Sequence, residues 1–179
     1  MTICSHIALM ADYNQWMNNK LYAAARTLPA EALAAERQAF FGSIIGTLNH
    51  LVVADTIWLQ RFAAHPANHP ALEAIVRLPA PTALNTLLFA DIEALSKQRQ
   101  LLDETIKQWA AQLSEDDLLA VLHYRNMKGI AAAKRFSSLV THFFNHQTHH
   151  RGQVSTLLFQ AGVDIGVTDL LALIPNQEA

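Results

Sequence analysis

Histidine is the residue type in this chain best suited to binding a metal ion or transferring a proton near neutral pH. The 179 residues include nine histidines, and four of them fall between residues 142 and 150. Within that segment His146 and His150 are four residues apart, which places their imidazoles on consecutive turns of one helix face. Two histidines so placed can share a metal ion, as in zinc-binding helices of the HExxH type. The segment predicts either part of a metal site or a pair of hydrogen-bonded core histidines.

The apolar residues of the same segment indicate which way these histidines point. At about 100° per residue, the apolar stripe covers a sector of about 60°. The stripe consists of Leu139, Phe143, Val154, Leu157 and Ala161. His146 and His150 lie about 20° to either side of Leu139, whereas His142 and His149 lie about 60° to 80° away, at its border. Burying two imidazoles side by side is costly without a metal or an acidic partner, so an inward-facing pair favours the metal site.

A third ligand must come from another helix, and a second periodic segment offers His50 and Asp55. Asp55 belongs to the main apolar stripe of that segment, whereas His50 lies on a second, partly apolar face. An inward-facing Asp55 could also orient a ligand imidazole instead of binding the ion itself. Periodicity does not decide between the two residues.

The other histidines and the single cysteine give no comparable signal. His65, His69 and His123 fall in predicted loops or strands, and we expect their side chains to be solvated. Cys4 is the only cysteine, which excludes an intramolecular disulfide, a cysteine-rich zinc site and a CxxC redox motif.

Helical periodicity dominates the chain and predicts the elements that position these residues. We expect four long helices and one short one, over residues 5–27, 43–64, 82–113, 137–161 and 170–174. Ser137 or Ser138 should cap the fourth long helix, and Gly162 should end it. Residues 65–81, with four prolines, form a loop, and residues 118–136 contain a possible short hairpin. The hairpin turn would be Asn126-Met127-Lys128-Gly129.

These elements predict one all-α domain over residues 1–179, a four-helix bundle with a long crossover, which is an architecture that commonly holds metal sites.

The composition is 51% hydrophobic and 16% charged, with 13 basic and 15 acidic residues. That balance argues against nucleic acid as a partner. No apolar run approaches the roughly 20 residues of a membrane span, and the N-terminus lacks a signal-peptide pattern, so we expect a cytoplasmic protein. The apolar excess leaves surface for a homodimer.

Three segments of the sequence resemble the DinB/YfiT-like family of four-helix-bundle proteins. They are Tyr13-Asn14-Gln15-Trp16-Met17-Asn18, the stretch from Leu48 to Leu59, and Asn145-His146-Gln147-Thr148-His149-His150-Arg151-Gly152-Gln153. The resemblance extends over nearly the whole chain. It implies a divalent metal bound by a histidine of the second long helix and by both histidines of an HxxxH motif. In this sequence these are His50, His146 and His150, and the assignment of His50 rests on the resemblance.

Proteins similar to this sequence include S-transferases and isomerases that use low-molecular-weight thiols. Because three histidines leave coordination positions open, a bound ion (Ni, Zn or Fe) could hold a small thiol as its thiolate. One hypothesis is therefore a thiol-dependent S-transferase or isomerase. The alternatives are a non-catalytic metal-binding or interaction protein, and a metal-dependent hydrolase. Hydrolysis ranks last because Gln147 stands where an HExxH helix has its general base.

Further side chains are candidates for a cleft beside the ligands or for contacts that orient them. A positively charged or aromatic cleft would favour an enzyme over a non-catalytic protein. The four cleft candidates also have a structural interpretation, with the tryptophan in the core, the tyrosine in the hairpin and the two arginines as surface charge. The candidates are Asp55, Trp58, Arg61, Tyr124, His142, His149 and Arg151.

Overall fold

Side-chain caps begin three of the four long helices in the computed structural model, which describes residues 2–176. Thr2 caps α1 (Ile3–Ala25), Ser43 caps α3 (Ile44–Phe62) and Asp91 caps α5 (Ile92–Gln112). In each case the side-chain oxygen accepts a hydrogen bond from a backbone N–H of the first turn, which would otherwise lack a partner. The fourth long helix is α6 (Phe136–Gln160).

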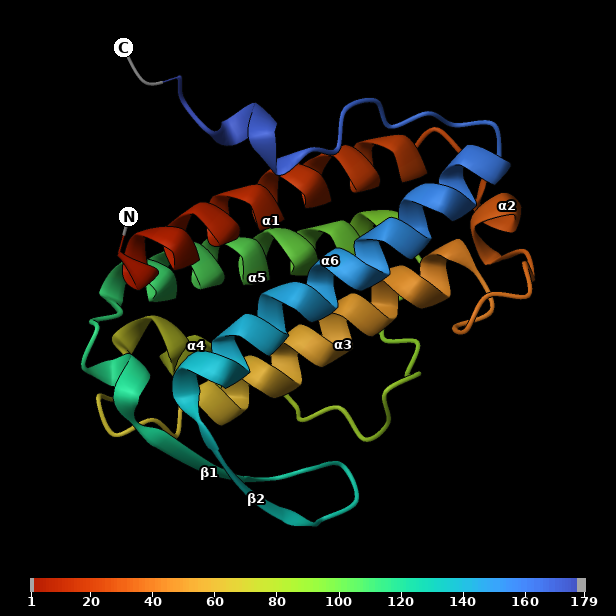
Figure 1. Ribbon diagram of the computed structural model, residues 1–179. Coiled ribbons are helices and arrows are strands. Elements are labelled where there is room, and N and C mark those ends of the chain that lie inside the picture. The colour runs from red at the N-terminus through yellow and green to blue at the C-terminus, as the bar shows by residue number, and fades with distance from the viewer. Residues whose placement is uncertain (1, 177–179) are drawn as a thin grey trace.

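The four long helices form a closed bundle in which each packs against two others (Figure 1). Around the bundle the order is α1, α5, α3 and α6, so α3 and α6 are neighbours. The predicted four-helix bundle is therefore confirmed. No helix among residues 2–176 combines the length and apolar character needed to cross a membrane.

Short elements connect the long helices. Between α1 and α3 lies α2 (Ala30–Ala34), and the long crossover from α3 to α5 carries the 3₁₀ helix η1 (Pro70–Leu72) and α4 (Glu73–Val76). After α5 come η2 (Asp117–Leu119) and the strands β1 (Val121–Arg125) and β2 (Ala131–Arg135), and η3 (Leu170–Leu173) follows α6.

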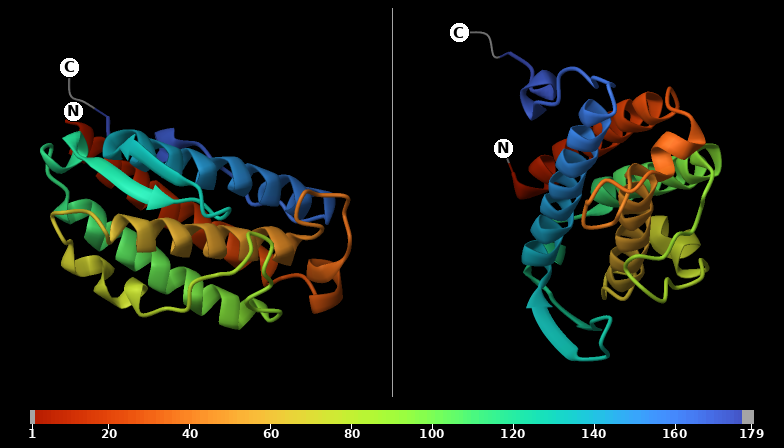
Figure 2. Two further views of the ribbon diagram at one scale, coloured as in Figure 1. Left: turned by 90° about the horizontal axis from the view of Figure 1, so that it is seen from below. Right: turned by 90° about the vertical axis from the view of Figure 1, so that its right-hand side faces the viewer.

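The hairpin predicted before the last long helix is present at the end of the bundle where α6 begins (Figures 1 and 2). Strands β1 and β2 are antiparallel, with Tyr124 opposite Ala132. In the turn, the N–H of Gly129 donates to the carbonyl of Asn126. Gly129 has a φ of 75°, which glycine adopts without steric cost.

The helix predicted over residues 82–113 is wrong in its first part, because α5 begins at Ile92. Residues 82–91 form a loop instead. Asn49 of α3 holds this loop by bonding both backbone groups of Phe89, accepting from its N–H at 2.9 Å and donating to its carbonyl at 2.8 Å. These long-range hydrogen bonds take the place of the backbone hydrogen bonds of a helix. Asp91 then caps α5 at its observed start.

The predicted start of the last long helix is also wrong, because neither Ser137 nor Ser138 caps α6. Strand β2 passes directly into α6, and the N–H of Phe136 donates to the carbonyl of Ala120 at 2.8 Å. This contact to the residue before β1 satisfies the first N–H of the helix without a side-chain cap. The predicted end is correct, since α6 stops at Gln160 and Gly162 follows with a φ of 85°.

His65 and His69 are buried, so the prediction that they are solvated is wrong for these two. His65 accepts from the N–H of Ala67, donates to the carbonyl of Asp117, and packs on Phe136 with ring centroids 4.4 Å apart. The segment after α3 folds back against η2 and α6, which loop composition did not reveal. His123 is exposed on β1, as predicted.

Replacing Asp91 with alanine is expected to lower the free energy of unfolding by about 1 kcal/mol, because the N–H of Ala94 loses its capping acceptor. Urea denaturation would measure the change. Lys97→Ala, at an exposed position of the same helix, is the matched control and should change stability by less than about 0.5 kcal/mol. Equal effects of the two substitutions would show that the cap does not stabilise α5.

Candidate metal centre

The packing of α3 against α6 brings His50, His146 and His150 together. One ring nitrogen from each lies within 4.8 Å of the other two. The ring centroids of His50 and His150 are 4.5 Å apart, and those of His146 and His150 are 4.4 Å apart. The three residues that the sequence singles out therefore form one cluster, although they come from helices almost a hundred residues apart.

The ring of His50 is fixed on two sides. Its Nδ1–H donates to the carbonyl of Leu84 at 2.8 Å, and its face stacks on Phe41 with centroids 3.8 Å apart. Gly46 helps to place Phe41, because a Cβ at this position would overlap the Phe41 carbonyl oxygen. With Nδ1 bound to a carbonyl, His50 directs the lone pair of Nε2 toward α6.

His150 is oriented in the same way by its own helix. Its Nδ1–H donates to Oε1 of Gln153 at 2.7 Å, while the Gln153 amide nitrogen lies 3.3 Å from Nε2 of the exposed His149. His149 thus fixes the amide orientation of Gln153, and Gln153 fixes the tautomer of His150. Metal-binding histidines usually donate their second ring N–H to an acceptor of this kind.

In the cluster, Nε2 of His50 lies 3.2 Å from Nε2 of His146. Burial lowers the pKa of His50 to about 4 and that of His146 to about 3, so both rings are neutral at pH 7. Two lone pairs cannot face each other at this distance unless a proton or a cation lies between them. Two nitrogens bound to one zinc ion at their usual bond length would lie about 2.9 to 3.4 Å apart, so the spacing fits a shared ion.

The carboxylate of Asp55 is used elsewhere in the bundle. It accepts hydrogen bonds from Arg99 of α5 at 2.5 Å and from Gln147 of α6 at 2.9 Å. Among residues 2–176, no imidazole donates a hydrogen bond to Asp55. The side chain of Gln147, the residue after His146, is 1% exposed and therefore faces the core instead of the open side of the cluster.

Arg151 also lies in the core. It is 2% exposed, donates to Asn14 and stacks over Tyr13 at 5.3 Å. The structure therefore places this arginine in the polar interior and not in a cleft.

The remaining cleft candidates gather beside the histidines. A pocket of about 460 Å³ is lined by His50 and His146 at one end and by Trp58, Arg61 and His142 elsewhere. His142 packs edge-on against Trp58, with ring centroids 5.1 Å apart, and Tyr124 also packs against Trp58, with centroids 5.5 Å apart. We call this the histidine pocket.

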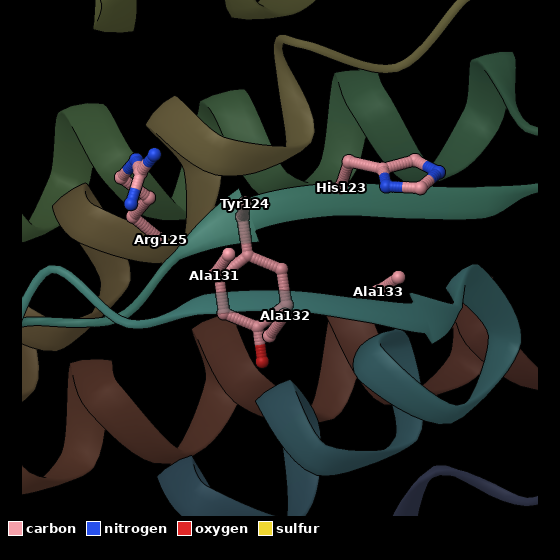
Figure 3. A pocket seen from close by; sticks show the side chains of 6 residues that line it. All are labelled: His123, Tyr124, Arg125, Ala131, Ala132 and Ala133. Carbon is pink, nitrogen blue, oxygen red and sulfur yellow. The ribbon is translucent and has the colours of Figure 1, made fainter.

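A second hollow lies over the hairpin (Figure 3). It is lined by residues of the two strands only: His123, Tyr124, Arg125, Ala131, Ala132 and Ala133. None of the three clustered histidines contributes to it, so it is not part of the candidate centre.

Comparison with known proteins agrees with this arrangement. The family model described as "DinB family" matches residues 3–178. The chain belongs to the DinB family. It is 28% identical over 158 residues to Protein DinB of Bacillus subtilis (strain 168), covering 88% of this chain and 87% of the relative. No solved structure matches it significantly. DinB family membership and the three-histidine cluster together are compatible with a metal-binding protein.

Sequence reasoning did not assign roles to three groups around the cluster in this DinB family member: the Leu84 carbonyl, the Phe41 ring and the Gln153 amide. Gln153 follows His150 by three residues on the helix, a spacing that could have signalled the contact. The other two come from loops whose path depends on tertiary contacts.

Replacing Gln153 with alanine is expected to weaken metal binding by about 10- to 100-fold, because His150 loses the acceptor that fixes its tautomer. Competition with a chromophoric zinc chelator would measure the affinity. Thr156→Ala, at an exposed position one turn further along α6, should leave the affinity unchanged. An unchanged affinity in Gln153→Ala would contradict the orienting role.

Proposed function

We propose that this DinB family protein binds one divalent transition-metal ion through His50, His146 and His150 and uses it to activate a small thiol. The reaction would be an S-transfer or an isomerisation. The observation that carries the proposal is the position of the cluster: the three ring nitrogens converge, and two of the three rings also line the histidine pocket.

The arrangement favours an enzyme over a purely structural site. Structural zinc sites are usually closed by four protein ligands, whereas three ligands leave room for a substrate group. A divalent ion held here would supply Lewis acidity, which lowers the pKa of a thiol enough for it to bind as the thiolate nucleophile. Neutral imidazoles accept several divalent transition metals, nickel, zinc and iron among them, so the donor set does not choose the ion.

The protein residues have separate tasks in this proposal. Leu84 and Gln153 hold two of the imidazoles in the tautomer that leaves Nε2 free. Phe41 covers one face of His50 and restricts access from that side. The substrate would therefore approach through the histidine pocket.

A non-catalytic role is the second candidate, and one observation favours it: His50 belongs to α3 and the other two histidines to α6. An ion held by all three would tie the two helices together and stabilise the fold. Hydrolysis is less well supported, because the buried Gln147 donates to Asp55 and supplies no general base at the cluster.

Thiol binding to the cobalt-loaded protein distinguishes these functions. Adding 2-mercaptoethanol should produce a thiolate-to-cobalt absorption band in the wild-type protein, and no band in His146→Ala. Ethylene glycol, which lacks sulfur, is the matched control compound. Cobalt bound at one ion per chain with no band on addition of thiol would support the non-catalytic role and contradict thiol activation.

A further inference from the structure

The histidine pocket carries positive charge at the end away from His50 and His146. Arg61 of α3 and Lys128 of the hairpin turn both line it, and none of its lining residues within the described part of the chain is acidic. The chain as a whole has a net charge of −2, so this local excess of positive charge is not a property of the surface in general.

Arg61 is held in place by aromatic rings and not by a carboxylate. Its guanidinium lies 4.7 Å from the centroid of Trp58 and 5.0 Å from that of Tyr124. The ion pairs found within residues 2–176 do not include Arg61, whereas Arg26 and Arg99 each pair with an acidic side chain. Because its guanidinium is already held in place, Arg61 can donate N–H groups to a ligand in the pocket with little further loss of side-chain entropy.

The desolvation of the Arg61 guanidinium in the pocket also favours an anion as the ligand. Partial burial lowers the pKa of Arg61, because it removes water from around the charged guanidinium. A bound anion would offset that loss of hydration through charge-assisted hydrogen bonds. A planar guanidinium matches a carboxylate especially well, since two parallel N–H groups meet two oxygens.

The rest of the pocket suits the hydrocarbon part of a small molecule. Its lining also includes the apolar residues Ala54, Ile57, Met127 and Ile130. His50 and Arg61 are eleven residues apart on α3, or about 16 Å along the helix axis. The arginine side chain leans back toward the N-terminus of its helix, which shortens this gap. A ligand that reaches from one end to the other therefore needs several bonds between its two polar groups.

We propose that the histidine pocket binds a small organic acid, with Arg61 holding the carboxylate and Lys128 supporting it. This inference rests on the proposed function, because it places the opposite end of the same molecule near the histidine cluster. It assigns Arg61 as the residue that selects anionic over neutral substrates. The tryptophan and tyrosine rings act through Arg61 by fixing its guanidinium.

The pocket can be tested without any metal, by titrating hexanoate, 1-hexanol and hexyl phosphate into metal-free protein and following the NMR signals of the Arg61 side chain and the Trp58 indole. We expect hexanoate to bind about 10-fold more tightly than hexanol, the scale of one hydrogen bond to a charged group. Arg61→Gln should remove this preference while leaving hexanol binding unchanged. The control Arg77→Gln, at an exposed position outside the pocket, should retain it.

Several results would overturn the inference. Equal binding of hexanoate and hexanol, or the same preference in Arg61→Gln, would show that Arg61 does not bind the carboxylate. Tighter binding of hexyl phosphate than hexanoate would assign the site to phosphate esters instead. A parallel measurement of zinc uptake separates this result from the proposed function: hexanoate selectivity without zinc uptake would refute the metal site alone, and zinc uptake without selectivity would refute the carboxylate site alone.

Discussion

Replacing Arg99 with alanine is expected to lower the free energy of unfolding by about 3 to 5 kcal/mol, because two buried carboxylates would lose the guanidinium that pairs with both of them. Arg99 is 2% exposed and pairs with Asp55 at 2.5 Å and with Asp103 at 3.0 Å. Asn14 and Asn18 also donate to Asp103. Together with Gln147, this network joins all four long helices.

Urea denaturation measures the effect, with the exposed Arg77→Ala as the matched control. The control should change stability by less than about 0.5 kcal/mol. A loss below about 1 kcal/mol in Arg99→Ala would show that the network contributes little beyond what an apolar replacement provides.

The pH dependence gives an independent check on the same network. Burial raises the pKa of both Asp55 and Asp103, while Arg99 opposes the shift. Without Arg99 these pKa values should rise further in the folded state and stay ordinary in the unfolded state. The folded variant then binds protons more tightly, so its deficit relative to the wild type should shrink as the pH falls from about 7 toward 4. A constant deficit would contradict this explanation.

Metal binding is expected to have the second large effect, on stability. An ion that binds only the folded state, at a free concentration of 100 times its Kd, adds about 2.7 kcal/mol to the free energy of unfolding. Removing the ion with a chelator should abolish the gain. His146→Ala should show no gain, because it removes the ring whose Nε2 lies 3.2 Å from that of His50.

His123→Ala is the control for this experiment, since His123 is an exposed histidine on the hairpin, outside the cluster. Thermal unfolding with and without added zinc would measure the gain in each protein. Equal stabilisation of His146→Ala and the wild type would place the bound ion at a different site.

The bundle and the inward-facing histidines of α6 could be predicted from the sequence because a long amphipathic helix repeats its pattern over many turns. Leu139 and its periodic partners define the buried face of α6, and His150 lies on it at 9% exposed. The hairpin was indicated by the loss of helical period after Leu118 and by the Asn126-Met127-Lys128-Gly129 turn, in which Gly129 has a positive φ.

The outcome for α3 shows where periodicity stops being informative. His50 and Asp55 are both buried, at 3% and 1% exposed. Asp55 faces the bundle interior, where Arg99 and Gln147 donate to it, whereas His50 lies on a second face of α3 that the loop over residues 82–91 contacts. That loop is held by Asn49 and by its contact with His50, which are tertiary contacts with no local signal. For the same reason the sequence suggested an earlier start for α5 and did not reveal that Leu84 orients a candidate ligand.

The most direct test of the metal centre is elemental analysis of the untagged protein after incubation with zinc, nickel or iron(II) and removal of free ions. We predict close to one ion per chain in the wild type and in His123→Ala, and little or none in His50→Ala, His146→Ala and His150→Ala. A wild-type protein that retains none of these ions, or three cluster variants that retain as much as the wild type, would contradict the assignment of these histidines as a metal site.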